Sequence, residues 1–265
     1  VMMAQIELDG ELVTYDESCF EVATGPENKI LGIRYKGNGG KVPQPKGLTS
    51  YVSLFFWNTK IRELDLSDWD TTGVREFAFM FDSCTNLEVI KGIENFDVSL
   101  CSDFSGVFND CTHLKKLDLS KWDMRKAVSV CGMFMACTDI EEINVSTWKM
   151  PECVDYDSFV DVCSNLRKLD VSKWDTSSAQ TMERFACSCI NLEELSLENW
   201  DVSNLTVSTG AIANCPKLRT IDFSNWEISD FTIAKMYEHP EMKKLSANKL
   251  VETAENSWLP NMSMF

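Results

Sequence analysis

Cysteine and histidine are the residues of this chain whose types and spacing could support nucleophilic chemistry. The chain has two histidines, His113 and His239. Cys111 lies two residues before His113, and an imidazole next to a thiol can activate a cysteine nucleophile. The same cysteine position recurs at a fixed interval along the chain, however, so packing in a core explains Cys111 better. We therefore predict no catalytic residue and no enzymatic activity.

Metal and cofactor chemistry has equally little support in the sequence. No C-x-x-C pair is followed by a second pair or a histidine pair at zinc-ligand spacing. Gly37-Asn38-Gly39-Gly40 lacks the Lys-Ser/Thr of a phosphate loop and indicates a turn. A column of acids could bind calcium between repeats, but turn and helix capping explains it adequately; it contains Asp70, Asp97, Asp123, Asp175, Asp201 and Glu227. The sequence predicts no metal and no cofactor.

Most of the eleven cysteines lie on a regular period, which favours free thiols over disulfides. Free cysteine often serves as a small apolar core residue, and parallel side chains on stacked coils do not converge as a disulfide requires. The periodic cysteines are Cys84, Cys111, Cys137, Cys163, Cys189 and Cys215. We expect Cys19, Cys131 and Cys187 to be the exposed thiols. Free thiols in this number suit a reducing compartment.

A tryptophan recurs every 26 residues, and a cysteine follows it 15 residues later. The tryptophans are Trp69, Trp122, Trp148, Trp174, Trp200 and Trp226, and Phe96 fills the one gap. A fixed period of this size is typical of a supersecondary unit stacked on copies of itself. We expect these tryptophans to belong to the core, with Trp57 and Trp258 as the exceptions.

Each repeat contains two apolar patterns. The first, L-x-x-L-x-L, predicts a short strand with alternate residues facing inward. The second has apolar residues at helical spacing and predicts one or two turns of helix on the opposite side of the coil; in the first repeat it contains Val74, Phe77, Met80, Phe81 and Cys84. The predicted fold class is an α/β repeat solenoid with a parallel β-sheet on one face and short helices or turns on the other.

Charges next to the strands alternate in sign from one repeat to the next. One column contains Arg62, Glu88, Lys115, Glu141, Arg167, Glu193 and Arg219. Coils stacked in register place these side chains about 4.8 Å apart, where like charges would be unfavourable. We interpret the alternation as structural pairing between neighbouring coils rather than as a partner site.

The pattern L-x-x-L-D-L-S-x-W-D, followed by M-F-x-x-C-x-x-L, resembles the BspA-type leucine-rich repeat of bacterial surface proteins. The match is clearest from Ile61 to Leu87 and extends over residues 42–245. The resemblance implies a right-handed solenoid that attaches to host or microbial molecules and has no enzymatic activity. The family has no fixed catalytic or binding residues to carry over.

The chain divides into three predicted segments. Residues 1–41 are off the period and contain Asp9-Gly10 between two alternating runs, a hairpin signal. This hairpin is expected to cap the solenoid of residues 42–245, which has about eight coils at the 26-residue period. Met242 and Leu245 preserve a shortened strand there. Residues 246–265 are expected to form a C-terminal cap or tail.

The outward positions of the predicted strands are the best candidates for function. Their side chains are short and polar or acidic, and repeat proteins bind partners on extended surfaces of this kind. The positions are Asp65, Ser67, Asp118, Ser120, Asn144, Ser146, Asp170, Ser172, Asp222 and Ser224. We expect a non-catalytic module that binds a host or bacterial protein on this concave face, as a monomer. A glycan-binding surface module and an intracellular interaction scaffold are the alternatives.

Overall charge and hydropathy exclude other partner classes. The net charge of −16 argues against nucleic acid and against simple attraction to an anionic membrane. No stretch approaches the ~18–20 apolar residues of a membrane span. The resemblance implies a bacterial cell-surface or secreted protein, whereas no signal peptide is visible after Val1. The compartment therefore stays open between the cell surface and the cytoplasm.

Overall fold

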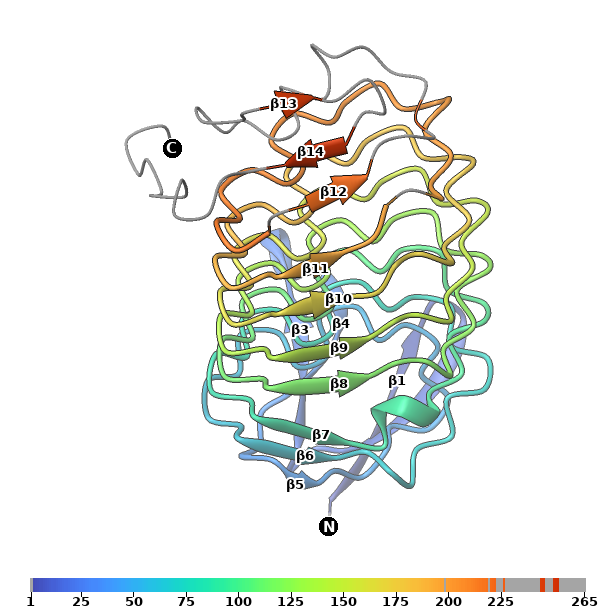
Figure 1. Cartoon of the computed structure of the whole chain (residues 1–265). Helices are drawn as coiled ribbons and strands as arrows, with labels where there is room; N and C mark the ends of the chain where they lie inside the picture. Colours follow the sequence, from blue (N-terminus) through green and yellow to red (C-terminus); the bar gives the residue numbers. More distant parts are fainter. Residues whose placement is uncertain are drawn as a thin grey trace.

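The computed structural model of the chain shows successive coils stacked from the N-terminal to the C-terminal end (Figure 1). It describes residues 2–197, 199–218, 220–222, 226, 244–245 and 250–252. Short strands from consecutive coils lie next to one another on one side, and turns form the opposite side. One hydrophobic core runs through the described coils.

Two antiparallel hairpins precede the coils. Strand β1 (Met3–Leu8) pairs with β2 (Glu11–Asp16), and the connecting residues Asp9 and Gly10 both have positive φ, 52° and 82°. This confirms the hairpin predicted from Asp9-Gly10. A second hairpin goes beyond the sequence prediction: β3 (Phe20–Thr24) pairs with β4 (Ile30–Tyr35), with the 3₁₀ helix η1 (Pro26–Asn28) between them.

The hairpins share their core with the coils. Val13, Phe20 and Ile33 are almost fully buried and belong to the same hydrophobic cluster as the repeat residues. The Tyr35 N–H also donates to the Leu54 carbonyl of the first coil at 2.7 Å. The hairpins are therefore packed on the solenoid, in keeping with a capping role; the boundaries at residues 41 and 245 stay predictions.

Strands of the coils are two or three residues long. They are β5 (Gly40–Lys41), β6 (Glu63–Asp65), β7 (Val89–Lys91), β8 (Lys116–Asp118), β9 (Glu142–Asn144), β10 (Lys168–Leu169), β11 (Glu194–Leu195), β12 (Thr220–Asp222), β13 (Lys244–Leu245) and β14 (Leu250–Glu252). Parallel pairing joins β5, β6 and β7, then β8 and β9, then β10 and β11. At the far end β14 lies between β12 and β13 and is antiparallel to both.

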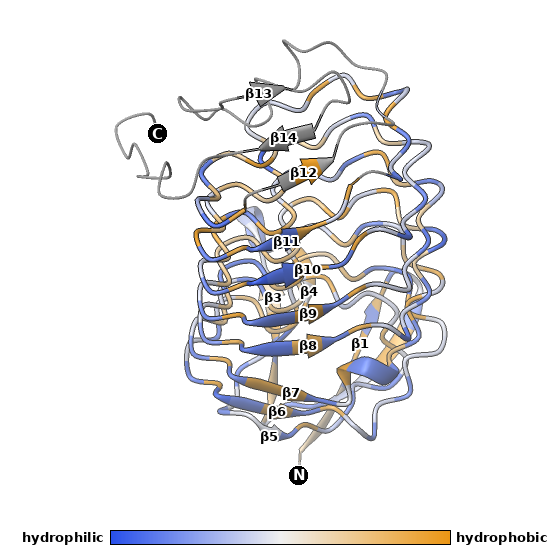
Figure 2. Ribbon diagram, in the orientation of Figure 1, coloured by the Kyte–Doolittle hydropathy of each residue, from blue (hydrophilic) through white to orange (hydrophobic). Residues whose placement is uncertain are grey.

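The register of the parallel pairs reproduces the sequence period. Leu117 lies opposite Ile143, and Leu169 lies opposite Leu195. In each strand the central apolar residue is buried while the preceding charged residue is exposed, as alternate side chains of a strand point to opposite faces. In Figure 2, β8 and β9 begin in hydrophilic blue and turn hydrophobic orange. The predicted position and alternation of the strands are confirmed, whereas the predicted single parallel sheet is divided into separate ladders, the last of them antiparallel.

The helical prediction for the opposite side of the coils is wrong. The described residues contain no α-helix, only the 3₁₀ helices η1 and η2 (Ile93–Asn95). The apolar residues with helical spacing are buried as expected, but tight turns place them there. Phe79, Phe81 and Ser83 donate their N–H groups to carbonyls of the next coil, so these donors cannot form a helical i→i−4 ladder.

Positive φ angles recur in two columns of these turns. The first contains Ser53, Phe79, Gly106, Gly132, Ser158, Arg184 and Gly210, and the second contains Trp57, Ser83, Asp110, Ala136, Val162, Ser188 and Asn214. A positive φ at the third residue is the requirement of a type II turn. Isolated parallel bridges join the turns of neighbouring coils through Asp103, Ser129, Asp155, Thr181 and Val207.

The tryptophans are buried hydrogen-bond donors. All six periodic tryptophans are at most 9% exposed. Each indole N–H donates to a backbone carbonyl in the preceding coil at 2.8–3.0 Å, as from Trp148 to Leu119. Successive indoles also stack: the Trp148 and Trp174 ring centroids lie 5.8 Å apart with planes 14° apart. The prediction that these tryptophans belong to the core is confirmed.

The periodic cysteines are a second column of donors. Each thiol donates to a carbonyl of the preceding coil at 3.0–3.1 Å, as from Cys137 to Phe108. All eleven cysteines are free. Cys19 and Cys131 are partly exposed as expected, but Cys187 is fully buried, so its predicted exposure is wrong. Cys187 lies close to the ion pair between Arg184 and Asp161.

Candidate binding surface on the strand face

The charged columns on the strand face form ion pairs between neighbouring coils. Lys116 Nζ lies 2.9 Å from Glu142 Oε1, and Lys168 Nζ lies 2.6 Å from Glu194 Oε1. In the first coils Arg62 Nη2 lies 2.6 Å from Glu88 Oε1. The predicted cross-coil pairing is confirmed for Arg62–Glu88 and, in the column one residue later, for Lys116–Glu142 and Lys168–Glu194, whereas Lys115 and Glu141 form no ion pair with a described residue. Because these side chains are exposed, the pairs set register more than they set stability.

The described members of the predicted binding set lie at the ends of the strands and in the turns that follow them. Each acceptor at the strand end binds the N–H of the residue two positions later: Asp118 accepts from Ser120 at 3.0 Å, and Asn144 accepts from Ser146 at 3.4 Å. The same contact joins Asp65 to Ser67 and Asp170 to Ser172. The hydrogen bonds from Ser67 hold the pKa of Asp65 below its usual value, and those from Ser120 do the same for Asp118.

These local hydrogen bonds give the Asp and Ser columns a structural role. They leave some of the side-chain oxygens free to accept further hydrogen bonds. All eight of the fully described members are exposed or half-buried. The backbone of Asp222 belongs to β12, while its side chain and Ser224 lie outside the described residues. The role of the ten residues in binding stays a prediction.

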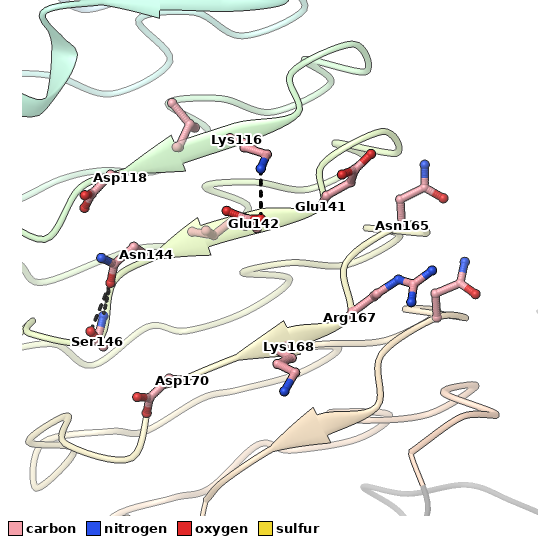
Figure 3. Close-up of a pocket in the computed structure, with 13 residues that line it drawn as sticks. Lys116, Asp118, Glu141, Glu142, Asn144, Ser146, Asn165, Arg167, Lys168 and Asp170 are labelled. Carbon is pink, nitrogen blue, oxygen red and sulfur yellow. Dashed lines mark hydrogen bonds and ion pairs between the residues drawn. The ribbon is translucent and has the colours of Figure 1, made fainter.

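A groove of about 1080 Å³ crosses the strand face at β8, β9 and β10. Of the strands around the groove, β8 pairs with β9 and β10 pairs with β11. β9 and β10 are not hydrogen-bonded to each other. The ion pairs follow the same grouping, since Lys116–Glu142 and Lys168–Glu194 each join strands that also share a ladder. We call the boundary between β9 and β10 the seam. The groove lies over this seam (Figure 3).

Several polar groups at the seam have few internal contacts. Within the described structure, Glu141 has no ion pair, and Arg167 Nη1 reaches the carboxylate of Glu193 only at 4.0 Å. The Asn165 side chain makes no hydrogen bond there, whereas its counterpart Asn191, one coil later, donates to the Ser164 carbonyl at 2.7 Å. Figure 3 shows Glu141 just before β9, and Asn165 and Arg167 in the loop before β10.

The groove has mixed charge, where the sequence indicates an acidic surface. Its cations are Lys116, Arg167 and Lys168, and its carboxylates are Asp118, Glu141, Glu142 and Asp170. Of the predicted binding residues, only Asp118, Asn144, Ser146 and Asp170 border it. From the sequence, the charged columns are interpreted as structural pairing, so Glu141 and Arg167 are not predicted to belong to the candidate site. The only sequence signal for these two residues is the alternation of charge along their column.

The possible cysteine nucleophile is not assembled. The His113 imidazole lies against the Thr85 carbonyl, with Nδ1 at 2.6 Å, and is exposed. The Cys111 thiol donates to the Phe81 carbonyl at 3.1 Å, and burial raises its pKa well above the usual value. His239 lies outside the described residues.

The described acids considered as calcium ligands hold turns instead, and Glu227 lies outside the described residues. Asp97 accepts from the Ser99 N–H at 3.1 Å, and Asp201 accepts from the Ser203 N–H at 2.9 Å. In the part of the chain that the structure describes, no three Cys, His, Asp or Glu side chains are grouped so as to hold a metal ion. The same part contains no helix long and apolar enough to cross a bilayer.

Parallel strands one period apart, internal columns of tryptophan and cysteine, and a polar strand face define a repeat protein of stacked coils. Two matches to the family described as "Mycoplasma protein of unknown function, DUF285" cover residues 49–169 and 128–250. The chain belongs to this family.

Similarity to solved structures is distant. The chain is similar to the T. pallidum leucine-rich repeat protein TpLRR, with 16% identity, a TM-score of 0.46, and coverage of 83% of this chain and 94% of that one. It is also similar to a leucine-rich repeat protein from Bacteroides ovatus, with 14% identity and a TM-score of 0.38. That match covers 76% of this chain and 59% of the other. No curated protein matches the sequence.

Proposed function

We propose that this protein is a non-catalytic repeat module that binds a partner protein on its strand face. The groove over the seam is the centre of the proposed contact. The proposal includes a BspA-like role in attachment, in which the partner is a host or bacterial surface protein and the chain acts as a monomer.

The observation that carries this proposal is the concentration of incompletely paired polar groups in one groove. Glu141, Asn165 and Arg167 border about 1080 Å³ of open space, and each has hydrogen-bonding capacity left over. Charged and amide groups of both signs can pair with the mixed polar surface typical of proteins. An extended repeat face suits a macromolecular partner better than a small molecule.

A glycan partner is the second candidate, and one observation favours it. Trp57 is 70% exposed, and exposed tryptophan can stack on a sugar ring. It lies in a turn of the first coil, and no aromatic residue borders the groove. The two candidates therefore use different surfaces. The variant Trp57→Ala separates them, because it would abolish glycan capture on an array and leave protein binding intact.

A photocrosslinking experiment tests the protein-binding proposal. A crosslinking amino acid at Asn165 is expected to capture a partner from host or bacterial surface extracts, and the captured protein is then purified and its affinity measured. The double variant Glu141→Lys, Arg167→Glu exchanges the two charges at the seam without changing net charge. We expect it to weaken binding about tenfold or more, since close charge complementarity is lost.

The matched control is Lys149→Glu, Glu152→Lys, which exchanges two exposed charges that do not border the groove. It should bind the purified partner as the unaltered protein does. Equal affinity of the groove variant and the control variant would refute the strand-face site.

A further inference from the structure

A second, smaller pocket lies between the N-terminal hairpins and the first coil. It has a volume of about 420 Å³ and is bordered by the tip of the β1–β2 hairpin, by β4 and by the turn at residues 48–52. Its buried aliphatic residues are Val13, Ile33 and Leu48. None of its lining residues belongs to the groove over the seam. We call it the hairpin pocket.

Exposed aliphatic side chains surround the hairpin pocket. Ile30, Leu31 and Val52 are 48%, 64% and 42% exposed. Clustered exposed apolar residues that continue into a buried apolar floor are characteristic of interaction sites. The three residues come from β4 and from the first coil, so the cluster exists only because the hairpin packs on the solenoid.

A β-bulge presents Leu31 to solvent. In the β3–β4 hairpin, Ala23 pairs with Gly32 and Thr24 pairs with Ile30, so Leu31 is the extra residue. Bulges redirect a side chain and commonly occur at strand edges and functional sites. Gly32 has φ of 143°, and a Cβ at this position would meet nothing within 4 Å. The backbone of β4 is therefore openly accessible at the bulge.

The edge of β4 that faces away from β3 has a peptide group without a hydrogen-bond partner. The Tyr35 N–H bonds outward to the first coil, and alternate residues of a strand direct their polar groups to the same side. The N–H and carbonyl of Ile33 therefore face the same way, and neither has a partner outside the β3–β4 pair in the described structure. Ile33 is only 4% exposed, so an extended segment can reach this edge only through the hairpin pocket, which Ile33 borders.

The charge of the hairpin pocket specifies what such a segment must contain. Its charged lining residues are Glu7, Asp9 and Glu76, and no lysine or arginine borders it. None of the three carboxylates forms an ion pair with another described residue. They do not form a metal-binding group either. Carboxylates spread around an apolar floor are complementary to a cationic side chain adjacent to an aliphatic one.

We propose that the hairpin pocket is a second interaction surface, which takes an extended segment of a partner protein carrying lysine or arginine next to an aliphatic residue. The aliphatic side chain packs on Val13 and Leu48 beside Leu31. The cation pairs with the carboxylates of the pocket, and the backbone of the segment pairs with the edge of β4. This surface is independent of the strand face, so one can fail without the other.

Fluorescence anisotropy with a defined peptide tests the proposal on the full chain. The probe is a labelled, acetylated and amidated octapeptide of alternating lysine and valine, and its counterpart has glutamate in place of lysine. We expect saturable binding of the lysine peptide and none of the glutamate peptide. The triple variant Glu7→Gln, Asp9→Asn, Glu76→Gln should weaken binding about tenfold, because three exposed pairs are lost together.

Two matched controls separate the pocket from general attraction to an acidic protein. The variant Glu11→Gln, Glu21→Gln, Glu27→Gln removes the same charge from exposed positions of the same hairpins outside the pocket and should retain affinity. Leu31→Ser should weaken binding severalfold, whereas Leu12→Ser, at a leucine that is 60% exposed and does not border the pocket, should not.

Three outcomes would overturn the proposal. The first is the absence of saturable binding of the lysine peptide. The second is equal affinity for the glutamate peptide. The third is equal weakening by the pocket variants and their controls. Melting temperatures of all variants, which replace exposed side chains, verify that the fold is retained.

Discussion

Tryptophan and cysteine recur along the stacked coils, rather than other apolar residues, because the indole N–H and the thiol S–H can donate hydrogen bonds inside the core. A coil that turns sharply leaves backbone carbonyls inside the core without a strand partner, and each buried carbonyl has two lone pairs to satisfy. The carbonyls of Leu119 and Phe108 accept the N–H groups of Trp122 and Cys111 within their own coils. The indole N–H of Trp148 and the thiol of Cys137 supply these carbonyls with a second donor from the next coil. Phenylalanine would fill the space without supplying the hydrogen bond.

Replacing Trp148 by phenylalanine tests this role. The change removes the donor to the Leu119 carbonyl, which lies 2.9 Å from Nε1, and keeps an aromatic ring in the stack. We expect a loss of about 0.5–1.5 kcal/mol in the free energy of unfolding, because the Leu119 carbonyl loses this hydrogen bond and keeps the one from the Trp122 N–H. Urea denaturation measures it. Trp57→Phe, at an exposed indole, is the control and should change stability little; equal losses in the two variants would contradict the role.

The buried thiols also make stability depend on pH. Burial raises the pKa of Cys84, Cys101 and Cys153 from 9.0 to about 12. A thiol that keeps its proton longer in the folded state than in the unfolded state stabilises the fold fully below about pH 9. That contribution is lost as pH rises from about 9 toward 12. We therefore expect the urea midpoint to fall steadily above about pH 9.

Cys101→Ala separates the thiols from other alkaline titrations. It removes one group with a raised pKa, so its urea midpoint should decline less steeply above about pH 9 than that of the unaltered chain, whatever its stability at neutral pH. If the urea midpoint of the variant declines with pH as steeply as that of the unaltered chain, groups other than the Cys101 thiol cause the loss of stability at alkaline pH.

At the scale of elements, the turn side of the coils depends on backbone conformations that are strained for most residue types. A non-glycine residue with positive φ is unfavourable by about 1–2 kcal/mol. Gly132 has φ of 59°, and a Cβ there would meet only the Met135 Cβ, at 3.9 Å. Ser158, one coil later, has φ of 53°. The conformation is the same at both positions, so glycine should be preferred at both.

Exchanges at these two positions distinguish a turn from a helix. Gly132→Ala should destabilise the fold by about 1–2 kcal/mol, and Ser158→Gly should stabilise it by up to about 1 kcal/mol. In a helix both signs would be reversed, because alanine is about 1 kcal/mol better than glycine there. Chemical denaturation of the two variants measures both effects. A stabilising Gly132→Ala would contradict the turn conformation.

The sequence predicts the strands and the core well because each depends on a column that repeats in every coil. It does not separate turns from helix, since Val74, Phe77 and Phe81 have helical spacing and are buried in either conformation. The signal for positive φ is a column that contains Gly106, Gly132 and Gly210. The second hairpin also escapes the sequence prediction, although Phe20 and Val22 face Tyr35 and Ile33 with strand-like alternation.

The candidate site is only partly predictable for a different reason. Lys116–Glu142 and Lys168–Glu194 are paired, whereas the equally complementary columns across β9 and β10 are not. In the described structure the ladder is also absent between β7 and β8 and between β11 and β12. The missing ladder alone therefore does not distinguish the seam, and the repeating sequence does not indicate which of these boundaries carries a groove.

At the scale of the whole molecule, the alternating charges give the stack a period of two coils rather than one. Removing residues 151–176 deletes one period and places Glu142 next to Glu194, and Glu141 next to Glu193. Removing residues 125–176 deletes two periods and places Lys116 next to Glu194 instead. Like charges one coil apart are unfavourable, while opposite charges are favourable.

The two deletions should therefore differ in how salt changes their stability. At about 1 M salt the charges are screened within about 3 Å, so added salt should raise the melting temperature of the one-period deletion, which has like charges on neighbouring coils, relative to that of the two-period deletion. Each exposed pair contributes only about 0.2–1 kcal/mol, so the protein with more coils should be the more stable of the two at both salt concentrations. Melting followed by circular dichroism at low salt and at about 1 M salt measures this, and an equal effect of salt on the two deletions would show that charge alternation does not govern how the coils stack.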